Sequence, residues 1–211
     1  MTPGHRAEGG ALGGPPPRHG RSRGPATRPD LPAGPAAASP ILRSAGPGDA
    51  AALLRLKQRL DSETSFMLFE ADERDASVPV LATELERVAG SPNSVVIVAD
   101  LRGDLVGYVE LNGGRVRRSR TTAQVVLGVL SASSGRGIGS GLLAEAKSWA
   151  SAHGLHRLEL TVMAHNTRAI RLYERCGFRA EGRRNQCLFV DGQFVDELFM
   201  AVFVPRGGAA E

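Results

Sequence analysis

The run Ser134-Gly-Arg-Gly-Ile-Gly-Ser-Gly141 places glycines at alternate positions between two segments of opposite character. Residues 122–130 before it are apolar and rich in β-branched side chains, which is typical of a buried strand. Residues 138–153 after it repeat apolar side chains at helical spacing, as far as Gly154. At such a junction several N–H groups of the helix N-terminus lack partners, and a phosphate can approach them where no Cβ intervenes. The run therefore predicts a phosphate or pyrophosphate site, and with it a ligand that carries a nucleotide.

Three other interpretations of the glycine run fit its residues less well. A kinase-type P-loop needs a lysine directly after its last glycine, but the first lysine after this run is Lys147. A dinucleotide-binding fingerprint counted from Gly135 ends at Ser140 instead of a glycine, and the acidic candidate Glu159 lies inside the next strand rather than at its end. A plain strand–helix turn needs only one residue of positive φ, so the other glycines would be unexplained.

A second block of sequence, together with the glycine run, resembles a known family. Residues 134–139 match the acyl-CoA-binding motif Gln/Arg-x-x-Gly-x-Gly/Ala, and residues 166–178 are similar to the signature Asn-x-x-Ala-x-x-Leu-Tyr-x-x-x-Gly-Phe. Both motifs, in this order and at this spacing, are those of the GCN5-related N-acetyltransferase superfamily, and the resemblance covers residues 41–204. One departure is Ser134, which stands at the usual Gln/Arg position, although Arg136 keeps a positive charge two residues away.

The chain outside the two motifs predicts an α+β domain. We expect strands or helices over segments bounded by turn residues, in this order: strand 41–45, helix 49–60, loop 61–77, helix 80–89, hairpin 94–111 around residues 102–104, strand 122–130, helix 138–153, strand 158–162, a helix from Asn166 to Gly177, and a hairpin of 187–190 and 193–204. The sheet should be mixed and mostly antiparallel, with one right-handed parallel crossover. The resemblance implies three α/β/α layers and a sheet splayed at its parallel strand pair.

The resemblance also implies acetyl-CoA as co-substrate and direct attack of an amine on its thioester in a ternary complex. The residues expected to bind it are Val129, Leu130, Gly135, Arg136, Gly137, Ile138, Gly139, Ser140, Asn166 and Tyr173. Tyr173 lies seven residues after Asn166, about two helical turns on, so both share one helix face. The family places this tyrosine near the CoA sulfur, where a phenol of pKa ~10 suits protonation of the leaving thiolate. Left open are a tyrosine that only packs and an asparagine that only caps its helix.

A general base is harder to identify from the sequence. An alkylammonium of pKa about 10.4 needs to lose a proton before it can attack at neutral pH. Glu110 and Glu159 lie in apolar strand contexts, and Glu63 lies in the loop region that shapes the acceptor pocket in relatives. We prefer Glu110 slightly; each of the three could equally be a solvated or salt-bridged carboxylate, and a chain of water molecules could replace them all.

Residues 1–40 differ in kind from the rest of the chain. They hold 9 Pro and 8 Gly, which predicts a disordered tail, and residues 205–211 are expected to be a disordered C-terminal end. With 5 Arg against Glu8 and Asp30, the tail supplies +3 of the formal net charge of +4, so the basic balance does not indicate a nucleic-acid partner for the folded part. No secretory core or membrane span is visible, and a cytoplasmic location is expected.

The cysteines and histidines of the chain are not spaced as the ligands of a metal site are. Cys176 and Cys187 form no C-x-x-C motif, and the histidines are scattered, so no metal is expected. The function predicted best is N-acetylation of a primary amine, with a small-molecule amine preferred over a protein N-terminus or lysine. A homodimer is possible in this class. The alternatives are a CoA-binding regulator without turnover and a phosphate- or nucleic-acid-binding module that uses the Arg-rich tail.

Overall fold

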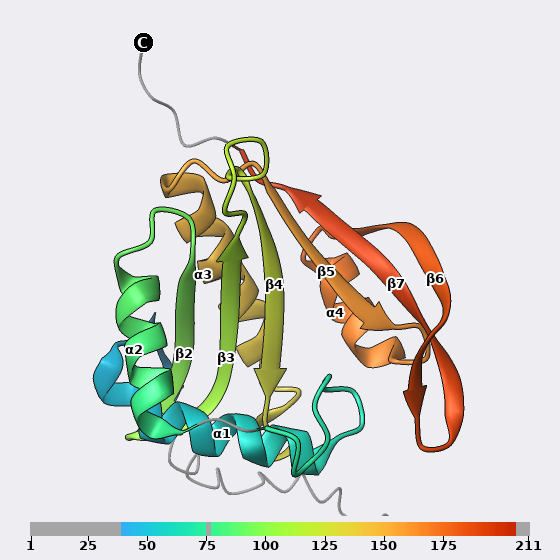
Figure 1. The fold of residues 1–211 in the computed structure, drawn as a ribbon, viewed down its shortest axis with the longest axis horizontal. Coiled ribbons are helices and arrows are strands. Elements are labelled where there is room, and N and C mark those ends of the chain that lie inside the picture. The colour runs from blue at the N-terminus through green and yellow to red at the C-terminus, as the bar shows by residue number, and fades with distance from the viewer. Residues whose placement is uncertain (1–38, 75–76, 206–211) are drawn as a thin grey trace, which may run out of the picture. The chain divides into compact units, whose positions relative to one another are not determined.

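The computed structural model describes residues 39–74 and 77–205. The predicted disordered tail and C-terminal end therefore lie almost entirely outside the described residues, and those two expectations stay predictions. Within the described part, one sheet carries helices on both of its faces (Figure 1).

Seven strands form this sheet in the order β1-β2-β3-β4-β5-β7-β6. The strands are β1 Ile41–Ser44, β2 Val95–Leu101, β3 Asp104–Gly113, β4 Thr122–Val129, β5 Arg157–Met163, β6 Arg179–Val190 and β7 Gln193–Phe203; the helices are α1 Ala50–Glu63, α2 Val78–Ala89, α3 Ile138–Ala152 and α4 Thr167–Arg175. Among the described strands, β4 and β5 are the single parallel pair. The predicted three-layer fold with a mixed, mostly antiparallel sheet is confirmed.

The pairing of β4 with β5 is short. It comprises three residue pairs, Thr122 with Arg157, Ala123 with Leu158 and Gln124 with Glu159. Beyond them the two strands diverge, and Figure 1 shows the gap widening toward the carboxyl end of β4. Residues 125–129 of β4 still pair with β3 on their other side. The sheet is therefore splayed at its parallel pair, as expected, and one edge of β4 faces the gap.

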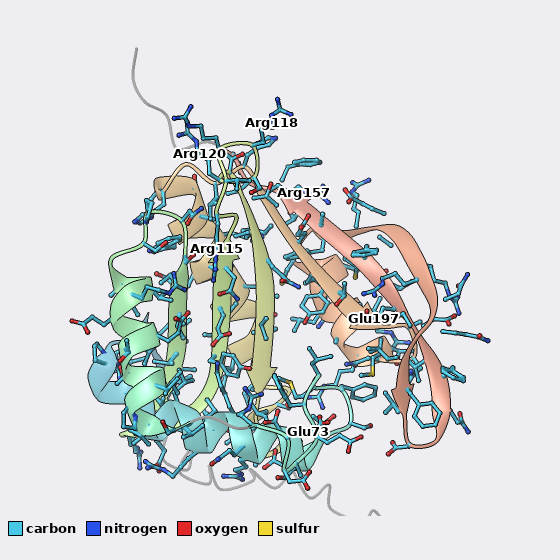
Figure 2. The ribbon with its side chains drawn as sticks, in the orientation of Figure 1. Glu73, Arg115, Arg118, Arg120, Arg157 and Glu197 are labelled. Carbon is cyan, nitrogen blue, oxygen red and sulfur yellow. The ribbon has the colours of Figure 1, made fainter. Side chains whose placement is uncertain are left out.

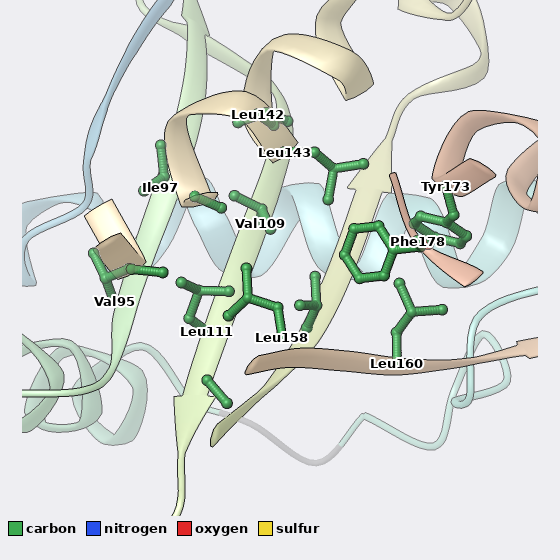
Figure 3. Close-up of a cluster of buried hydrophobic side chains, with 14 of the residues drawn as sticks. Val95, Ile97, Val109, Leu111, Leu142, Leu143, Leu158, Leu160, Tyr173 and Phe178 are labelled. Carbon is green, nitrogen blue, oxygen red and sulfur yellow. The ribbon is translucent and has the colours of Figure 1, made fainter. Parts of the chain in front are cut away.

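Two hydrophobic clusters hold the helices to the sheet. One packs α3 and α4 on one face, with Leu142, Leu158 and Phe178 fully buried within it (Figure 3). The other packs α1 and α2 on the opposite face, around Leu53 and Tyr108. Successive side chains of a strand point to opposite faces of the sheet. In β5 and β7, Leu160 and Met200 therefore lie in the first cluster, and the residues next to them in sequence point to the opposite face.

Several element boundaries differ from those that the sequence predicts. Helix α1 continues to Glu63 rather than ending near Leu60, and α2 begins at Val78 rather than Val80. The larger difference is β6, which begins at Arg179 instead of Cys187. Its first eight residues are exposed at the edge of the sheet and mostly polar, so they carry no apolar alternation, and their pairing with β7 decides their conformation.

Candidate active site

A cleft of about 730 Å³ opens where β4 and β5 part. Its lining comes from the diverging strands, the glycine run, α4 and the loop that follows α1. Of the sequence-predicted site residues, the cleft brings together Glu63, Val129, Gly135, Gly137, Ile138, Gly139, Ser140, Asn166 and Tyr173. Leu130, Arg136, Glu110 and Glu159 are not among its lining residues.

The glycine run forms one wall of the cleft as a turn that leads into α3. Gly135 and Gly137 have φ values of +79° and +80°, which only glycine adopts without strain, and a Cβ at either position would meet nothing within 4 Å. The first backbone hydrogen bond of α3 runs from the Gly141 N–H to the Gly137 carbonyl. Within the described residues, the N–H groups of residues 135–140 donate to no backbone carbonyl. The turn thus offers a set of unpaired N–H groups at a positive helix end, which suits a phosphate.

The end of β4 forms the floor of the cleft. Leu130 is less available than the sequence suggests, because its N–H donates to the Val106 carbonyl at 3.0 Å and its own carbonyl accepts from the Ser133 N–H at 2.9 Å. Val129 pairs with Gly107 on the β3 side, and it lines the cleft on the other. The unpaired edge of β4 can therefore hydrogen-bond an amide-containing ligand much as a neighbouring strand would.

Helix α4 is fixed at both ends by its own residues. The Asn166 side chain accepts a hydrogen bond from the Ala169 N–H at 3.1 Å, so the asparagine is an N-cap as well as a residue of the cleft. Gly177, with φ of +92°, ends the helix, and the Phe178 N–H then donates to the Tyr173 carbonyl at 3.0 Å. Phe178 packs against the Tyr173 ring, with 5.7 Å between ring centroids.

Tyr173 combines burial with access to the cleft. Its side chain belongs to the core around α3 and α4 (Figure 3), and it also lines the cleft. Burial raises the pKa of its hydroxyl to about 12. The phenol therefore keeps its proton throughout the neutral and moderately alkaline range, which is what a proton donor in the cleft requires.

The three carboxylates proposed from the sequence lie in different surroundings. Glu63 lines the cleft, but its Oε2 accepts from the Ser131 N–H at 3.0 Å and its Oε1 from Arg59 at 2.7 Å. The hydrogen bond from the Ser131 N–H, and to a smaller extent the one from Arg59, holds the pKa of this carboxyl below its usual range. Glu110 pairs instead with the Lys57 ammonium beneath α1.

Glu159 lies elsewhere on the sheet. Its carboxylate accepts from Arg157 at 2.9 Å, and both residues line a separate shallow hollow together with Glu181. Arg136 is exposed and does not line the cleft. The structure therefore places two of the three candidate bases, and the charged residue of the glycine run, away from the cleft.

One carboxylate of the cleft was not foreseen from the sequence. Glu197 on β7 lies opposite Met163 in the register of β5 and β7, is 7% exposed, and lines the cleft. Nothing in the local pattern Asp-Glu-Leu-Phe marks it, because its position depends on the pairing of strands distant in sequence. Within residues 39–74 and 77–205, no group of three potential metal-ligating side chains is present, and no helix is long and apolar enough to cross a membrane.

Comparisons with known proteins agree with this geometry. The family model described as the acetyltransferase (GNAT) family matches residues 60–178. L-amino acid N-acetyltransferase AaaT of Escherichia coli K12 is 32% identical over 120 residues, which cover 55% of this chain and 72% of the relative. Spermidine N(1)-acetyltransferase of the same organism is 26% identical over 155 residues, covering 71% of this chain and 80% of the relative.

Solved structures show the same fold. A GNAT-family acetyltransferase from Streptococcus pneumoniae superposes with a TM-score of 0.75 at 30% identity, covering 78% of this chain and 98% of the other. The acetyltransferase YncA of Salmonella typhimurium, solved with its cofactor acetyl-CoA, superposes with a TM-score of 0.71 at 21% identity, covering 82% and 99%.

Proposed function

Because the chain belongs to the GNAT family of acetyltransferases and is an acetyl-CoA-dependent N-acetyltransferase, we propose that its acceptor is a small-molecule primary amine. The amine attacks the thioester directly while both substrates are bound. One observation carries this proposal: the unpaired N–H groups of the glycine turn and the buried phenol of Tyr173 lie in the same cleft. The relatives named as L-amino acid and spermidine acetyltransferases support a small-molecule acceptor.

The residues of the cleft fit acetyl-CoA, which supplies a reactive acetyl thioester. The N–H groups of residues 135–140 would bind the pyrophosphate. The unpaired edge of β4 at Val129 and the Asn166 side chain would bind the amides of the pantetheine arm. We assign no binding role to the Leu130 backbone, since both of its polar groups are already paired.

Two proton movements accompany the transfer. The amine nitrogen forms a bond to the thioester carbonyl carbon, and the carbon–sulfur bond breaks. The Tyr173 hydroxyl donates its proton to the departing thiolate, and its raised pKa ensures that the proton is present. Of the sequence-predicted bases, Glu63 alone lines the cleft, and both of its oxygens are engaged. The amine proton therefore leaves through water rather than directly to Glu63.

The two tyrosines of the chain allow a matched test of the acid. We expect Tyr173→Phe to lower kcat by about 10²-fold or more, measured as released thiol, while the melting shift given by acetyl-CoA stays unchanged. Tyr108→Phe is the control, because Tyr108 is also buried but packs under α1 and does not line the cleft. Equal turnover by the two variants would remove Tyr173 from the acid role. Thiol release with no amine acetylated would argue against the proposed function as a whole.

A further inference from the structure

The carboxylate of Glu197 is anchored through one oxygen and free at the other. Its Oε2 accepts from Arg184 Nη1 at 3.0 Å and from the Cys187 thiol, with the sulfur 3.5 Å away. Among the described residues, no group donates a hydrogen bond to Oε1. In the same residues, every fully buried side-chain oxygen has a hydrogen-bond partner, so an oxygen without one, such as Oε1, keeps some exposed surface. Oε1 is therefore not fully buried, and the residue that carries it lines the cleft. An ionised carboxylate held in this way is a ready acceptor for an N–H donor.

A bulge in β6 sets the position of these partners. The register of β6 with β7 shifts between Arg184 and Leu188, so three residues of β6 are left without a partner on β7. Within the bulge, Gln186 has a φ of +51°, and its N–H donates to Asp196 Oδ1 at 2.6 Å. The bulge turns Cys187 toward Glu197, so the chain specifies this carboxylate's surroundings rather than leaving it on a plain strand.

Glu197 faces the side of the sheet opposite to the glycine turn and α4. Its neighbour Leu198 packs with the cluster under α3 and α4, so strand alternation sends Glu197 to the face that carries α1. Figure 2 shows Glu197 at the carboxyl end of β5, where it lies beside β7. The groups that suit acetyl-CoA and the Glu197 carboxylate thus approach the gap from different faces, which leaves this face for the second substrate.

Apolar side chains form several of the walls around Glu197 on this face. Met163 from β5 and Leu188 from β6 line the cleft on its own side of the gap. Phe66, Met67 and Leu68 line it from the loop after α1, and the Phe66 ring contacts His165 beyond β5, with 5.2 Å between ring centroids. A substrate here would meet hydrocarbon on several sides and one carboxylate oxygen able to accept a hydrogen bond.

On these grounds, and resting on the proposed function, we propose that Glu197 binds the ammonium group of the acceptor. The acceptor is then a primary amine with a single positive charge and an apolar body, apolar amino acids included, rather than a polyamine. A polyamine needs several carboxylates, but the described lining holds only Glu63 and Glu197, and Glu63 has both oxygens engaged. Burial of apolar surface favours the apolar body of such an acceptor.

The test compares three amines on wild-type enzyme and on Glu197→Gln. The amines are 2-phenylethylamine, L-leucine and spermidine, with transfer followed by released thiol and by mass of the product. We expect the better of the first two to exceed spermidine at least about tenfold in kcat/KM. Glu197→Gln should raise the KM of that amine about 10- to 100-fold, the effect of losing one charge-assisted hydrogen bond, with the acetyl-CoA melting shift unchanged. Glu197→Asp, which keeps the charge, should recover part of the loss.

A control variant and a second measurement separate a binding role of Glu197 from a structural one. Glu181→Gln also removes a carboxylate from the β6–β7 hairpin that is paired with an arginine, Arg157, but Glu181 does not line the cleft, so its amine KM should not change. The second readout is calorimetric binding of 2-phenylethylamine to the enzyme–CoA complex, which Glu197→Gln should weaken about 10- to 100-fold without lowering the melting temperature of the CoA complex.

The outcomes distinguish the two proposals. Higher kcat/KM with spermidine, or an amine KM that Glu197→Gln leaves unchanged, would overturn the role of Glu197 while acetyl transfer to amines still stood. A kcat loss at constant KM would equally overturn it as a binding residue. If acetyl-CoA binds but no amine is acetylated, the proposed function fails first.

Discussion

Gly137 lies at the point where the backbone of the glycine turn and the space for a phosphate coincide. Gly137→Ala would force a left-handed φ of +80° on a residue with a Cβ, at a cost of about 1–2 kcal/mol. No protein atom lies within 4 Å of that Cβ, so steric repulsion within the protein adds nothing. For a chain of this size each kcal/mol corresponds to roughly 2–4 °C in Tm. We therefore expect the variant alone to melt about 2–8 °C below wild type.

The same methyl group would occupy open space at the glycine turn, whose unpaired N–H groups suit a phosphate. At 100 times its Kd, acetyl-CoA should stabilise wild type by about 2.7 kcal/mol. If the methyl group weakens binding 100-fold, the same concentration equals the new Kd, and the stabilisation falls to about 0.4 kcal/mol. The assay is a pair of melting curves, with and without acetyl-CoA, for each protein.

Gly154 supplies the matched control. It follows the C-terminal end of α3, has a φ of +71°, and also has no atom within 4 Å of a built Cβ, but it does not line the cleft. Gly154→Ala should therefore lose a similar amount of intrinsic stability and keep the full shift with acetyl-CoA. A full shift in Gly137→Ala, or an equal loss of shift in both variants, would refute the assignment of the glycine turn as the phosphate site.

Two further variants test the carboxylates proposed from the sequence. Glu110→Gln leaves the Lys57 ammonium without its partner, so we expect urea titration to show a fold less stable by about 3 kcal/mol. The kcat per folded molecule should stay within about threefold of wild type. A loss of kcat of about 10²-fold would instead return Glu110 to the role of base. Glu63 has a lowered pKa when folded, so it contributes stability above its unfolded pKa, and that contribution is lost as pH falls through its folded pKa. Melting curves between pH 7 and pH 3 should therefore show a smaller loss for Glu63→Gln than for wild type, and parallel losses would contradict this.

The glycine run and the second motif predicted most of the cofactor side of the cleft, because both act through local backbone geometry. Alternating glycines before a helix, and Asn166 with Gly177 around α4, determine turns and caps within a few residues of themselves. The parallel crossover was predictable for the same reason, because a strand, the glycine turn, α3 and the next strand follow one another directly. The splay at this pair was expected from the family resemblance, and the structure confirms it.

The acceptor side could not be predicted in this way. Glu197 reaches the cleft only through the register of β7 with β5, and its partners only through a bulge in β6, whose first half carries no apolar pattern. Likewise, nothing near Glu110 in sequence shows that Lys57, 53 residues away, occupies its carboxylate. Carboxylates are common on strands, and long-range pairing decides which one faces a cavity.

The short pairing between β4 and β5 also has a mechanical consequence. Three residue pairs join strands β1 to β4 to strands β5 to β7, and the buried cluster under α3 and α4 packs against both parts of the sheet. In the proposed arrangement the two substrates would approach that junction from opposite faces. Occupation of the gap would then stiffen the whole molecule, with the first ligand reducing the ordering entropy left for the second.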